Sequence, residues 1–329
     1  MAALPQSLTL LLVAASLILQ TSGRHLYFVT SSLTNKVSTL RALDLDGSVW
    51  PWPFPRYPHK ELLSYQLGPY NPGGGATGMC QLGEFLHWGD QTTATVHRVR
   101  LVDGKATEHD PSYVSHLSDP QGLHCDAKTN RVYVADNQLG TATVLYRTGD
   151  LPIQQLNITT QGFGQIRGMA SVGGSLWFAG DLGVFRTEEA GGDGGDVSLK
   201  MVLNGSVFEA IAADTTGKSP VLFASTYDWS GQGVLKGELD ASLKNVQGLH
   251  PMSGTECRSG TDTPWGLTTD SSRHELFWIL NDIEENMQIM METYGSSHQT
   301  AQAIYHGSKH TGYGLLLDLT AVESATALV

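Results

Sequence analysis

Residues able to bind or polarise a small molecule stand at one repeated position in this sequence, directly before a Gly or Ala that opens a short apolar run. The six positions hold one cation, one anion, two aromatic rings and two neutral polar groups: Thr77, Gln121, Arg167, Glu209, Trp265 and Tyr313. Gathered around one mouth, they would combine a few polar groups with aromatic walls, which is typical of a small-molecule site.

The residue types in this ring suggest roles. The expected catalytic residues are Arg167, Glu209 and Tyr313 of the ring, and His124 one layer deeper in the repeat. The expected substrate-binding residues are Thr77, Gln121, Trp265 and Tyr313. Arg167, Gln121 and Tyr313 would donate hydrogen bonds to a developing oxyanion, and Glu209 or His124 would accept a proton. The alternative is that Arg167 and Glu209 merely neutralise each other, that the aromatic rings plug a channel, and that His124 is a hydrogen-bonded structural group.

Short strands joined by turns must position this ring. The stretch from Gln121 to Arg147 contains three β-branched or aromatic runs bounded by Asp, Asn, Thr or Gly, which is typical of antiparallel strands. The first run recurs six times, at Gly78, Gly122, Gly168, Ala210, Gly266 and Gly314. The intervals, about 42 to 56 residues, match a four-stranded propeller blade. A uniformly apolar column follows these residues and is expected to form core: Met79, Leu123, Met169, Ile211, Leu267 and Leu315.

The two ends of the chain complete each other. His25 begins a second-strand pattern and Val37 a third-strand pattern, with no first strand before them, while the last copy at Gly314 has little chain left for its own blade. We therefore predict an all-β fold: a six-bladed β-propeller closed by pairing of the C-terminal strand with the N-terminal blade. Residues 24–329 are expected to form this single domain.

The first 23 residues read as a signal peptide. Leu8 to Leu19 is an apolar segment too short to span a membrane, and small residues precede a cleavage point near Gly23. We expect a secreted protein with glycosylation at Asn157 and Asn204, each in an N-x-S/T sequence. A buried N-terminal strand is the alternative for the apolar segment.

Charge and composition limit the partners. A net charge of −12 and a pI of about 5.4 argue against nucleic acid, because no polybasic stripe is available for a phosphate backbone. No later stretch is apolar enough for a membrane span. The expected partner is a small-molecule substrate, and the expected state is a monomer or weak homo-oligomer.

The cysteines and the familiar catalytic motifs give little chemistry. Cys80 and Cys125 fall on neighbouring inner strands slightly out of register, so free buried thiols are favoured over a disulfide, and Cys257 stands apart. No metal cluster is expected from them. The sequence contains no G-x-S-x-G elbow, H-E-x-x-H motif or nucleotide-binding Gly loop, so no cofactor is expected, and a single divalent cation stays an alternative.

The blades DPQGLHCDAKTNRVYVADNQLGTATVLYR and DTPWGLTTDSSRHELFWILND resemble six-bladed propellers of the gluconolactonase, strictosidine-synthase and NHL or YWTD-repeat type, over nearly the whole mature chain. Metal lactonases of that group carry an acidic residue in an L-G-E-x-P-like run. Leu82 to Phe85 matches this run only in part. The resemblance leaves a reduced metal site around Glu209, with ligands drawn from Asn137, Asn281 or Asp228.

The secreted, compact character of the chain is also similar to propeller proteins encoded beside fungal secondary-metabolite pathways. Some of these steer cycloadditions, including the hetero-Diels–Alder joining of a tropolone quinone methide to a terpene such as humulene. This resemblance implies a cofactor-independent enzyme that organises a cyclisation or cycloaddition. The alternatives are a metal-dependent lactonase or hydrolase of the gluconolactonase type, and a secreted binding propeller without catalysis.

Overall fold

The protein is built from β-strands in every part that the structure describes. The computed structural model describes residues 23–32, 35–47, 57–68, 75–138, 143–149, 152–156, 158, 164–188, 197–216, 218–227, 233–252, 263–281, 286–295, 301–307 and 311–318. Across these ranges there is no helix of the length and hydropathy that crossing a membrane requires. Residues 1–22 of the predicted signal peptide, Asn157, Cys257 and Asp228 lie outside the described residues.

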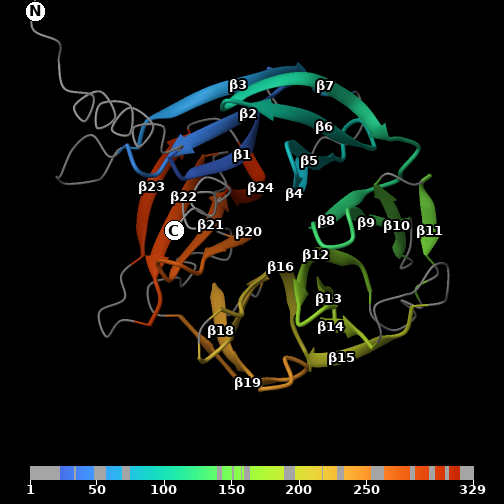
Figure 1. The fold of residues 1–329 in the computed structure, drawn as a ribbon, viewed down its shortest axis with the longest axis vertical. Helices are drawn as coiled ribbons and strands as arrows, with labels where there is room; N and C mark the ends of the chain where they lie inside the picture. Colours follow the sequence, from blue (N-terminus) through green and yellow to red (C-terminus); the bar gives the residue numbers. More distant parts are fainter. Residues whose placement is uncertain are drawn as a thin grey trace, which may run out of the picture.

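Within the described ranges, twenty-four strands form six antiparallel four-stranded sheets arranged as blades around a central channel (Figure 1). Blade I contains β24 (Thr311–Asp318), β1 (His25–Ser32), β2 (Val37–Asp44) and β3 (His59–Gln66). Blade II contains β4 (Ala76–Leu82), β5 (Phe85–Asp90), β6 (Thr95–Val102) and β7 (Lys105–Val114). Blade III contains β8 (Pro120–Asp126), β9 (Arg131–Asn137), β10 (Thr143–Gly149) and β11 (Gln154–Leu156).

The second half of the ring repeats this order from the channel outward. Blade IV contains β12 (Ile166–Val172), β13 (Ser175–Gly180), β14 (Gly183–Thr187) and β15 (Leu199–Asn204). Blade V contains β16 (Val207–Asp214), β17 (Val221–Tyr227), β18 (Val234–Leu239) and β19 (Val246–Pro251). Blade VI contains β20 (Thr263–Asp270), β21 (Glu275–Asn281), β22 (Met287–Thr293) and β23 (Gln302–Gly307). The predicted all-β, six-bladed propeller is confirmed.

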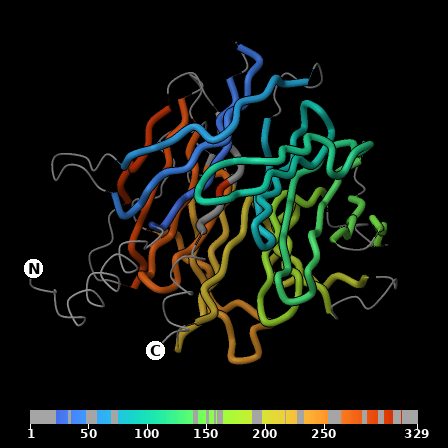
Figure 2. The backbone as a smooth tube through the Cα atoms, turned by 45° about the horizontal axis from the view of Figure 1, so that its top comes forward, coloured from blue at the N-terminus to red at the C-terminus, as the bar shows by residue number. Residues whose placement is uncertain are grey.

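The C-terminal strand closes the ring, as the sequence predicts. β24 pairs antiparallel with β1, with Leu26 opposite Leu317 and Phe28 opposite Leu315. Figure 2 shows the blue N-terminal strands running beside the orange and red C-terminal ones. Because the two ends of the chain share one sheet, no open sheet edge is left between them.

The hydrophobic core lies between the blades, in six clusters that each join two neighbours. In β1, Leu26 and Phe28 face blade VI, whereas Tyr27 and Val29 face blade II. Successive side chains of a strand point to opposite faces, so a blade buried on both sides needs continuous apolar runs. This explains why the inner two strands of each blade are readable in the sequence.

A disulfide joins Cys80 of β4 to Cys125 of β8, with the two Cα atoms 5.4 Å apart. The prediction of free thiols is therefore wrong. In the aligned repeats, Cys80 and Cys125 are offset by one residue. This offset does not keep the two sulfurs apart, because neighbouring inner strands share no hydrogen-bond ladder that would fix their register. His87 Nδ1 lies 3.9 Å from the Cys125 sulfur. These three side chains cluster closely enough for a metal, but the bonded sulfurs offer no thiolate.

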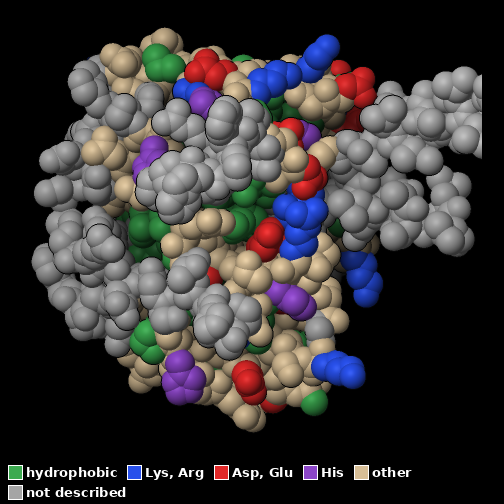
Figure 3. All heavy atoms as spheres, turned by 90° about the vertical axis from the view of Figure 1, so that its left-hand side faces the viewer, with side chains coloured by type: hydrophobic (Ala, Val, Ile, Leu, Met, Phe, Trp, Pro, Cys, Tyr) green, Lys and Arg blue, Asp and Glu red, His purple; other side chains and the backbone are tan. Residues whose placement is uncertain are grey.

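The surface agrees with the mixed charge of the sequence. On the face in Figure 3, acidic, basic and histidine side chains are scattered among polar ones rather than gathered by sign. Asn204 lies exposed at the end of β15, where the backbone turns at Gly205. The side chain is thus accessible, and attachment of a glycan to it stays a prediction.

Candidate pocket at the channel mouth

Every inner strand carries one irregularity, and it falls at the ring of residues singled out in the sequence. In β12 the pairing jumps from Ile166 to Gly168, which leaves Arg167 unpaired, and in β16 it jumps from Phe208 to Ala210, which leaves Glu209 unpaired. In β4, β8 and β24 the shift likewise skips the ring residue together with the glycine after it, whereas in β20 it skips only Gly266 and leaves Trp265 paired with Ile279. A β-bulge releases a residue from the ladder and re-aims its side chain. The bulges therefore release four of these residues from the ladder, and their side chains line the channel mouth: Thr77, Gln121, Arg167 and Glu209.

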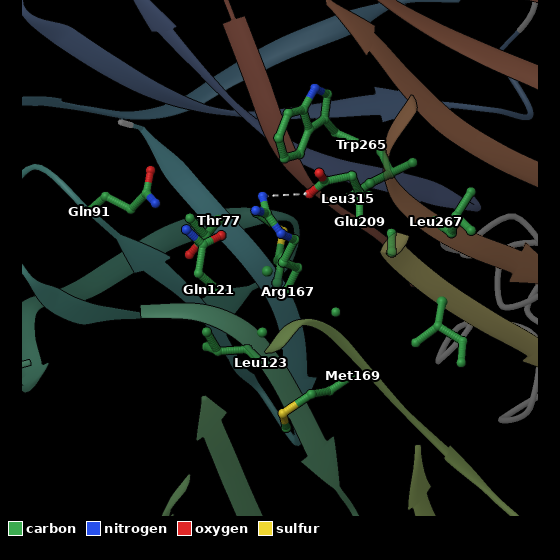
Figure 4. Close-up of a pocket in the computed structure, with 17 residues that line it drawn as sticks. Thr77, Gln91, Gln121, Leu123, Arg167, Met169, Glu209, Trp265, Leu267 and Leu315 are labelled. Atoms are coloured by element: carbon green, nitrogen blue, oxygen red, sulfur yellow. Dashed lines mark hydrogen bonds and ion pairs between the residues drawn. The ribbon is translucent and has the colours of Figure 1, made fainter. Parts of the chain in front are cut away.

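The bulged residues surround a pocket of about 320 Å³ (Figure 4). All six inner strands contribute to its lining. The polar and aromatic lining residues are Thr77, Gln91, Gln121, Arg167, Glu209 and Trp265. The apolar ones include the predicted core column: Met79, Leu123, Met169, Ile211, Leu267 and Leu315. Five of the six ring residues are thus brought together, and Tyr313 lies in β24 with its side chain outside the described part.

Glycines allow the inner strands to approach one another this closely. A Cβ on Gly78 would lie 2.6 Å from the Leu123 nitrogen, and one on Gly168 would lie 2.8 Å from the Ala210 Cα. Both contacts are with backbone atoms of the next blade, which cannot swing aside. Gly78 and Gly168 therefore set how closely their blades approach the next one at the channel mouth.

One side of the pocket is an ion-pair chain. Arg167 donates from Nη1 to Glu209 Oε2 at 3.2 Å and from Nε to Asp181 Oδ1 at 2.9 Å. Asp181 also accepts the backbone N–H of Gln165 through Oδ2, at 3.0 Å. The Glu209 side chain is only 3% exposed, whereas that of Arg167 is 26% exposed. Asp181 thus fixes the guanidinium, and Glu209 is the buried member of the pair.

Burial and charge pull the ionisation of this pair in opposite directions. Burial raises the pKa of Glu209 above its usual value, and the Arg167 charge and hydrogen bond offset part of that rise. Burial would lower the pKa of Arg167, but the Glu209 and Asp181 charges outweigh it and raise that pKa. Arg167 is therefore a fixed cation, and Glu209 is a carboxyl group that accepts a proton more readily than an exposed one.

The neighbouring side of the pocket, on blades II and III, has a neutral lining. Gln91 and Gln121 both direct their side-chain nitrogens at Asp119, over 2.6 and 3.0 Å to its Oδ1. Asp119 is held in turn because its backbone N–H donates to Asp136 Oδ1, 2.6 Å away. Since a carboxylate accepts only, these bonds orient both amides and leave their carbonyl oxygens for other partners. Gln121 thus differs from the donor expected from the sequence: its N–H groups face Asp119.

Two further ring residues, Thr77 and Trp265, differ in what their side chains contact. Thr77 is 4% exposed, and its hydroxyl donates to the Pro120 carbonyl at 2.7 Å, so it ties blade II to blade III. The indole of Trp265 lines the pocket on the same side as the Arg167–Glu209 pair and packs against the core between blades VI and I (Figure 4). Trp265 therefore forms a wall, as expected, while Thr77 acts mainly as a strand-to-strand bond.

His124 is not among the residues that line the pocket. It lies farther along β8, with its ring stacked on Tyr133 at 6.5 Å between centroids. Burial lowers the pKa of His124 to about 4. His124 therefore does not reach the pocket in which a proton acceptor would have to meet a substrate.

The pocket does not fit a divalent-metal centre. Glu209 is the one carboxylate among the described lining residues, and it already pairs with Arg167. Hard cations need several oxygen ligands converging on one point. Asn137, a ligand expected in the reduced metal site, bonds through both ends of its amide to the Ile166 backbone. Asn281 is buried in β21 and does not line the pocket, so no metal set assembles around Glu209 in the described residues.

Sequence reasoning missed the residues that orient the ring. Asp181 and Asp136 stand at the ends of second strands, and their carboxylates accept the backbone N–H groups of Gln165, Ser118 and Asp119. Their link to the pocket, by way of Arg167 and Asp119, depends on contacts between strands. The recurrence of Asp after the second strand was the available signal.

Comparisons with known proteins support the fold. No family model matches the chain, and no curated protein matches it in sequence. A chain in the crystal structure of a nidogen/laminin complex is similar, with a TM-score of 0.60 and 13% identity over 91% of this chain and 99% of that chain. The periplasmic gluconolactonase PpgL of Pseudomonas aeruginosa is similar with a TM-score of 0.52 and 11% identity, over 87% of this chain and 83% of that chain. At these identities the likeness establishes a six-bladed β-propeller and nothing finer.

Proposed function

We propose that the channel-mouth pocket binds a small organic molecule and that the protein is an enzyme acting on an oxygen-bearing group of that molecule. The observation that carries this proposal is the Arg167–Glu209 pair, fixed by Asp181 in a cavity whose lining is part polar and part apolar. A cavity of about 320 Å³ is at the small end of the usual range for ligand pockets, roughly 300 to 1,000 Å³.

The pair supplies two complementary functions. Arg167 is a fixed cation that stabilises negative charge as it develops on a carbonyl or enolate oxygen. Glu209 has a raised pKa and lies within hydrogen-bonding distance of the same guanidinium, so it is suited to take or return a proton. Trp265 and Leu267 would hold the apolar body of the substrate against these groups.

The finer proposal is a cofactor-independent cyclisation or cycloaddition of secondary metabolism, such as a hetero-Diels–Alder reaction in terpenoid–polyketide (tropolone) assembly. Such a reaction needs orientation of two reacting parts and polarisation of one oxygen, rather than a covalent intermediate. The described lining residues include no Ser, Cys or Lys, and the Thr77 hydroxyl is bonded to Pro120. This composition favours a site that positions and polarises.

A hydrolase that opens a lactone is the second candidate. The fold likeness to a gluconolactonase favours it, with Glu209 as base for an attacking water and Arg167 as partner of the oxyanion. The metal route of that class finds no ligand set here, so this candidate would work with side chains alone.

The test compares two reactions on the same purified protein. A quinone methide generated in solution with a terpene alkene measures cycloaddition by chiral chromatography, and gluconolactone measures hydrolysis by acid release. We expect a changed product ratio in the first assay, returned to the uncatalysed ratio by Arg167→Ala and by Trp265→Ala. Leu182→Ala, an exposed side chain outside the pocket, is the matched control.

Each outcome of these assays points to one class. Unchanged stereochemistry in both pocket variants would refute a cycloaddition in this pocket. Lactone opening that Glu209→Gln abolishes would favour the hydrolase. A protein that turns over neither compound but binds a protein partner would be the binding propeller that the sequence also allows.

A further inference from the structure

Arg24 anchors the start of the described chain inside the closing blades. Its side chain is 5% exposed, and Nη1 donates to Asp270 Oδ2 at 2.6 Å and to Glu275 Oε2 at 2.7 Å. Asp270 ends β20 and Glu275 begins β21, so both partners belong to blade VI. Arg24 directly precedes β1, so it ties the first strand of the ring to the last complete blade.

The backbone of Arg24 is bound as tightly as its side chain. Its N–H donates to Asp46 Oδ2 at 2.8 Å, Nε donates to Asp46 Oδ1 at 3.1 Å, and its carbonyl accepts the Leu45 N–H at 2.9 Å. A Cβ on Gly23 would lie 3.2 Å from Asp44 Oδ1. The peptide nitrogen between Gly23 and Arg24 therefore faces a region of carboxylate oxygens.

The charges around this nitrogen do not balance. The guanidinium groups of Arg24 and Arg273 face the carboxylates of Asp46, Asp270 and Glu275, and Asp44 lies beside Gly23. Carboxylates thus exceed cations in this cluster. A positive charge on the Arg24 nitrogen would meet an acceptor already in place, without moving a side chain.

We propose that the Gly23–Arg24 peptide bond is a processing site and that the α-ammonium group released on Arg24 forms an ion pair with Asp46. In the step, water adds across the amide: the C–N bond breaks, the water oxygen stays on Gly23, which leaves as a carboxylate, and the Arg24 nitrogen keeps the bonding electrons and gains both protons of the water. The apolar segment Leu8 to Leu19 and the small residues before Gly23 are the pattern that signal peptidases cut. The folded domain already holds an acceptor for the nitrogen that this cleavage would release, because the Arg24 N–H donates to Asp46 Oδ2.

Processing at this bond adds an interaction where the ring closes. The new ammonium would share Asp46, which follows β2 in blade I, with the guanidinium that reaches into blade VI. The ammonium group formed by cleavage would therefore strengthen the contact between blades I and VI that closes the ring. This inference does not depend on the reaction catalysed at the channel mouth.

The first experiment identifies the mature N-terminus. The full chain is expressed in a eukaryotic secretory host, and the secreted protein is analysed by N-terminal sequencing and intact mass. We expect a chain that starts at Arg24. A chain that starts at any other residue, or that keeps its first residues, would overturn the proposal.

The second experiment tests the ion pair with two proteins released from cleavable fusions, one starting at Arg24 and one at Gln20. Asp46→Asn removes the bond to Arg24 Nε in both, but removes the ammonium partner only in the chain starting at Arg24. We expect its Tm to fall by about 2 to 3 °C more in that chain. Glu275→Gln, which removes a partner of Nη1 alone, is the matched control and should lower both Tm values equally. Equal losses with Asp46→Asn would refute the ion pair.

Discussion

On each of the two sides of the pocket, an aspartate carboxylate orients the side chains that line it. On the side of blades IV and V, Asp181 fixes Arg167, which pairs with the buried Glu209. On the side of blades II and III, Asp119 fixes the amides of Gln91 and Gln121. Both orienting carboxylates lie just outside the pocket lining, and each acts through a side chain that reaches into it.

The difference lies in charge, and it divides the work of the pocket. The Arg167 side carries a cation and a carboxyl group of raised pKa, so it can stabilise charge and exchange a proton. The glutamine side offers carbonyl oxygens, so it selects for hydrogen-bond donors on the ligand without contributing charge. Chemistry is expected at one side of the mouth and recognition at the other.

The largest difference between the two sides is expected at acid pH, which should destabilise the glutamine side before the charged side. Burial lowers the pKa of His87, His97 and His124 to about 4, and all three lie in blades II and III. The unfolded chain takes up these protons nearer pH 6.5, so stability is present above that pH and lost as the pH falls toward 4. Each histidine accounts for at most about 3 kcal/mol.

Hydrogen exchange at pH 7 and pH 5 measures this asymmetry. We expect amides of blades II and III to lose protection at pH 5 before those of blades IV and V. His124→Leu removes one of the three titrations and should flatten the pH dependence of the unfolding free energy between pH 6.5 and 4. Uniform loss of protection around the ring would contradict the prediction.

The next largest effect is expected on the charged side, from Arg167→Met. The change strands the Glu209 carboxylate, whose side chain is 3% exposed. We expect a loss of about 2 to 3 kcal/mol at pH 8, below the 3 to 5 typical of a fully buried pair because Arg167 itself is partly exposed. The raised pKa of Glu209 would rise further, so the penalty appears as the pH rises above the ordinary carboxyl value and fades toward pH 5.

Urea unfolding at pH 5 and pH 8 checks this prediction. Adding Glu209→Gln to Arg167→Met removes the stranded charge and should recover most of the lost stability at pH 8. A double variant as unstable as the single one would mean that Arg167 acts through packing or through Asp181 instead.

These sides could be predicted from the sequence only in part. The ring of Thr77, Gln121, Arg167 and Glu209 follows from the repeat, because each residue precedes the Gly or Ala of an inner strand. The bulges, the disulfide and the orientation of the Gln121 amide do not follow from it. They depend on contacts between the inner strands of neighbouring blades. Those strands belong to different sheets, so no hydrogen-bond ladder fixes their register and the repeat pattern cannot predict it.

The scaffold beneath the two sides should respond alike. Gly78→Ala acts on the glutamine side and Gly168→Ala on the charged side, and each added Cβ would press on backbone of the next blade. We expect each to cost about 1 to 2 kcal/mol in thermal or chemical unfolding. Ala210 occupies the same column in blade V, so Ala210→Gly is the reverse control, expected to cost less than about 1 kcal/mol. Very different costs for the two glycines would show that the sides differ in backbone packing as well.

The smallest effects are expected from the orienting carboxylates themselves. Asp119→Asn gives the two glutamine amides a partner that both donates and accepts, so their single orientation is lost at a cost of about 1 kcal/mol. The side-chain N–H₂ signals of Gln91 and Gln121 in ¹⁵N NMR should lose their protection from exchange. Asp181→Asn should leave these signals unchanged and instead loosen Arg167, seen as faster exchange of its Nε–H. If either substitution disturbed both sides equally, the pocket would be one connected network, and the division into a charged and a neutral side would fail.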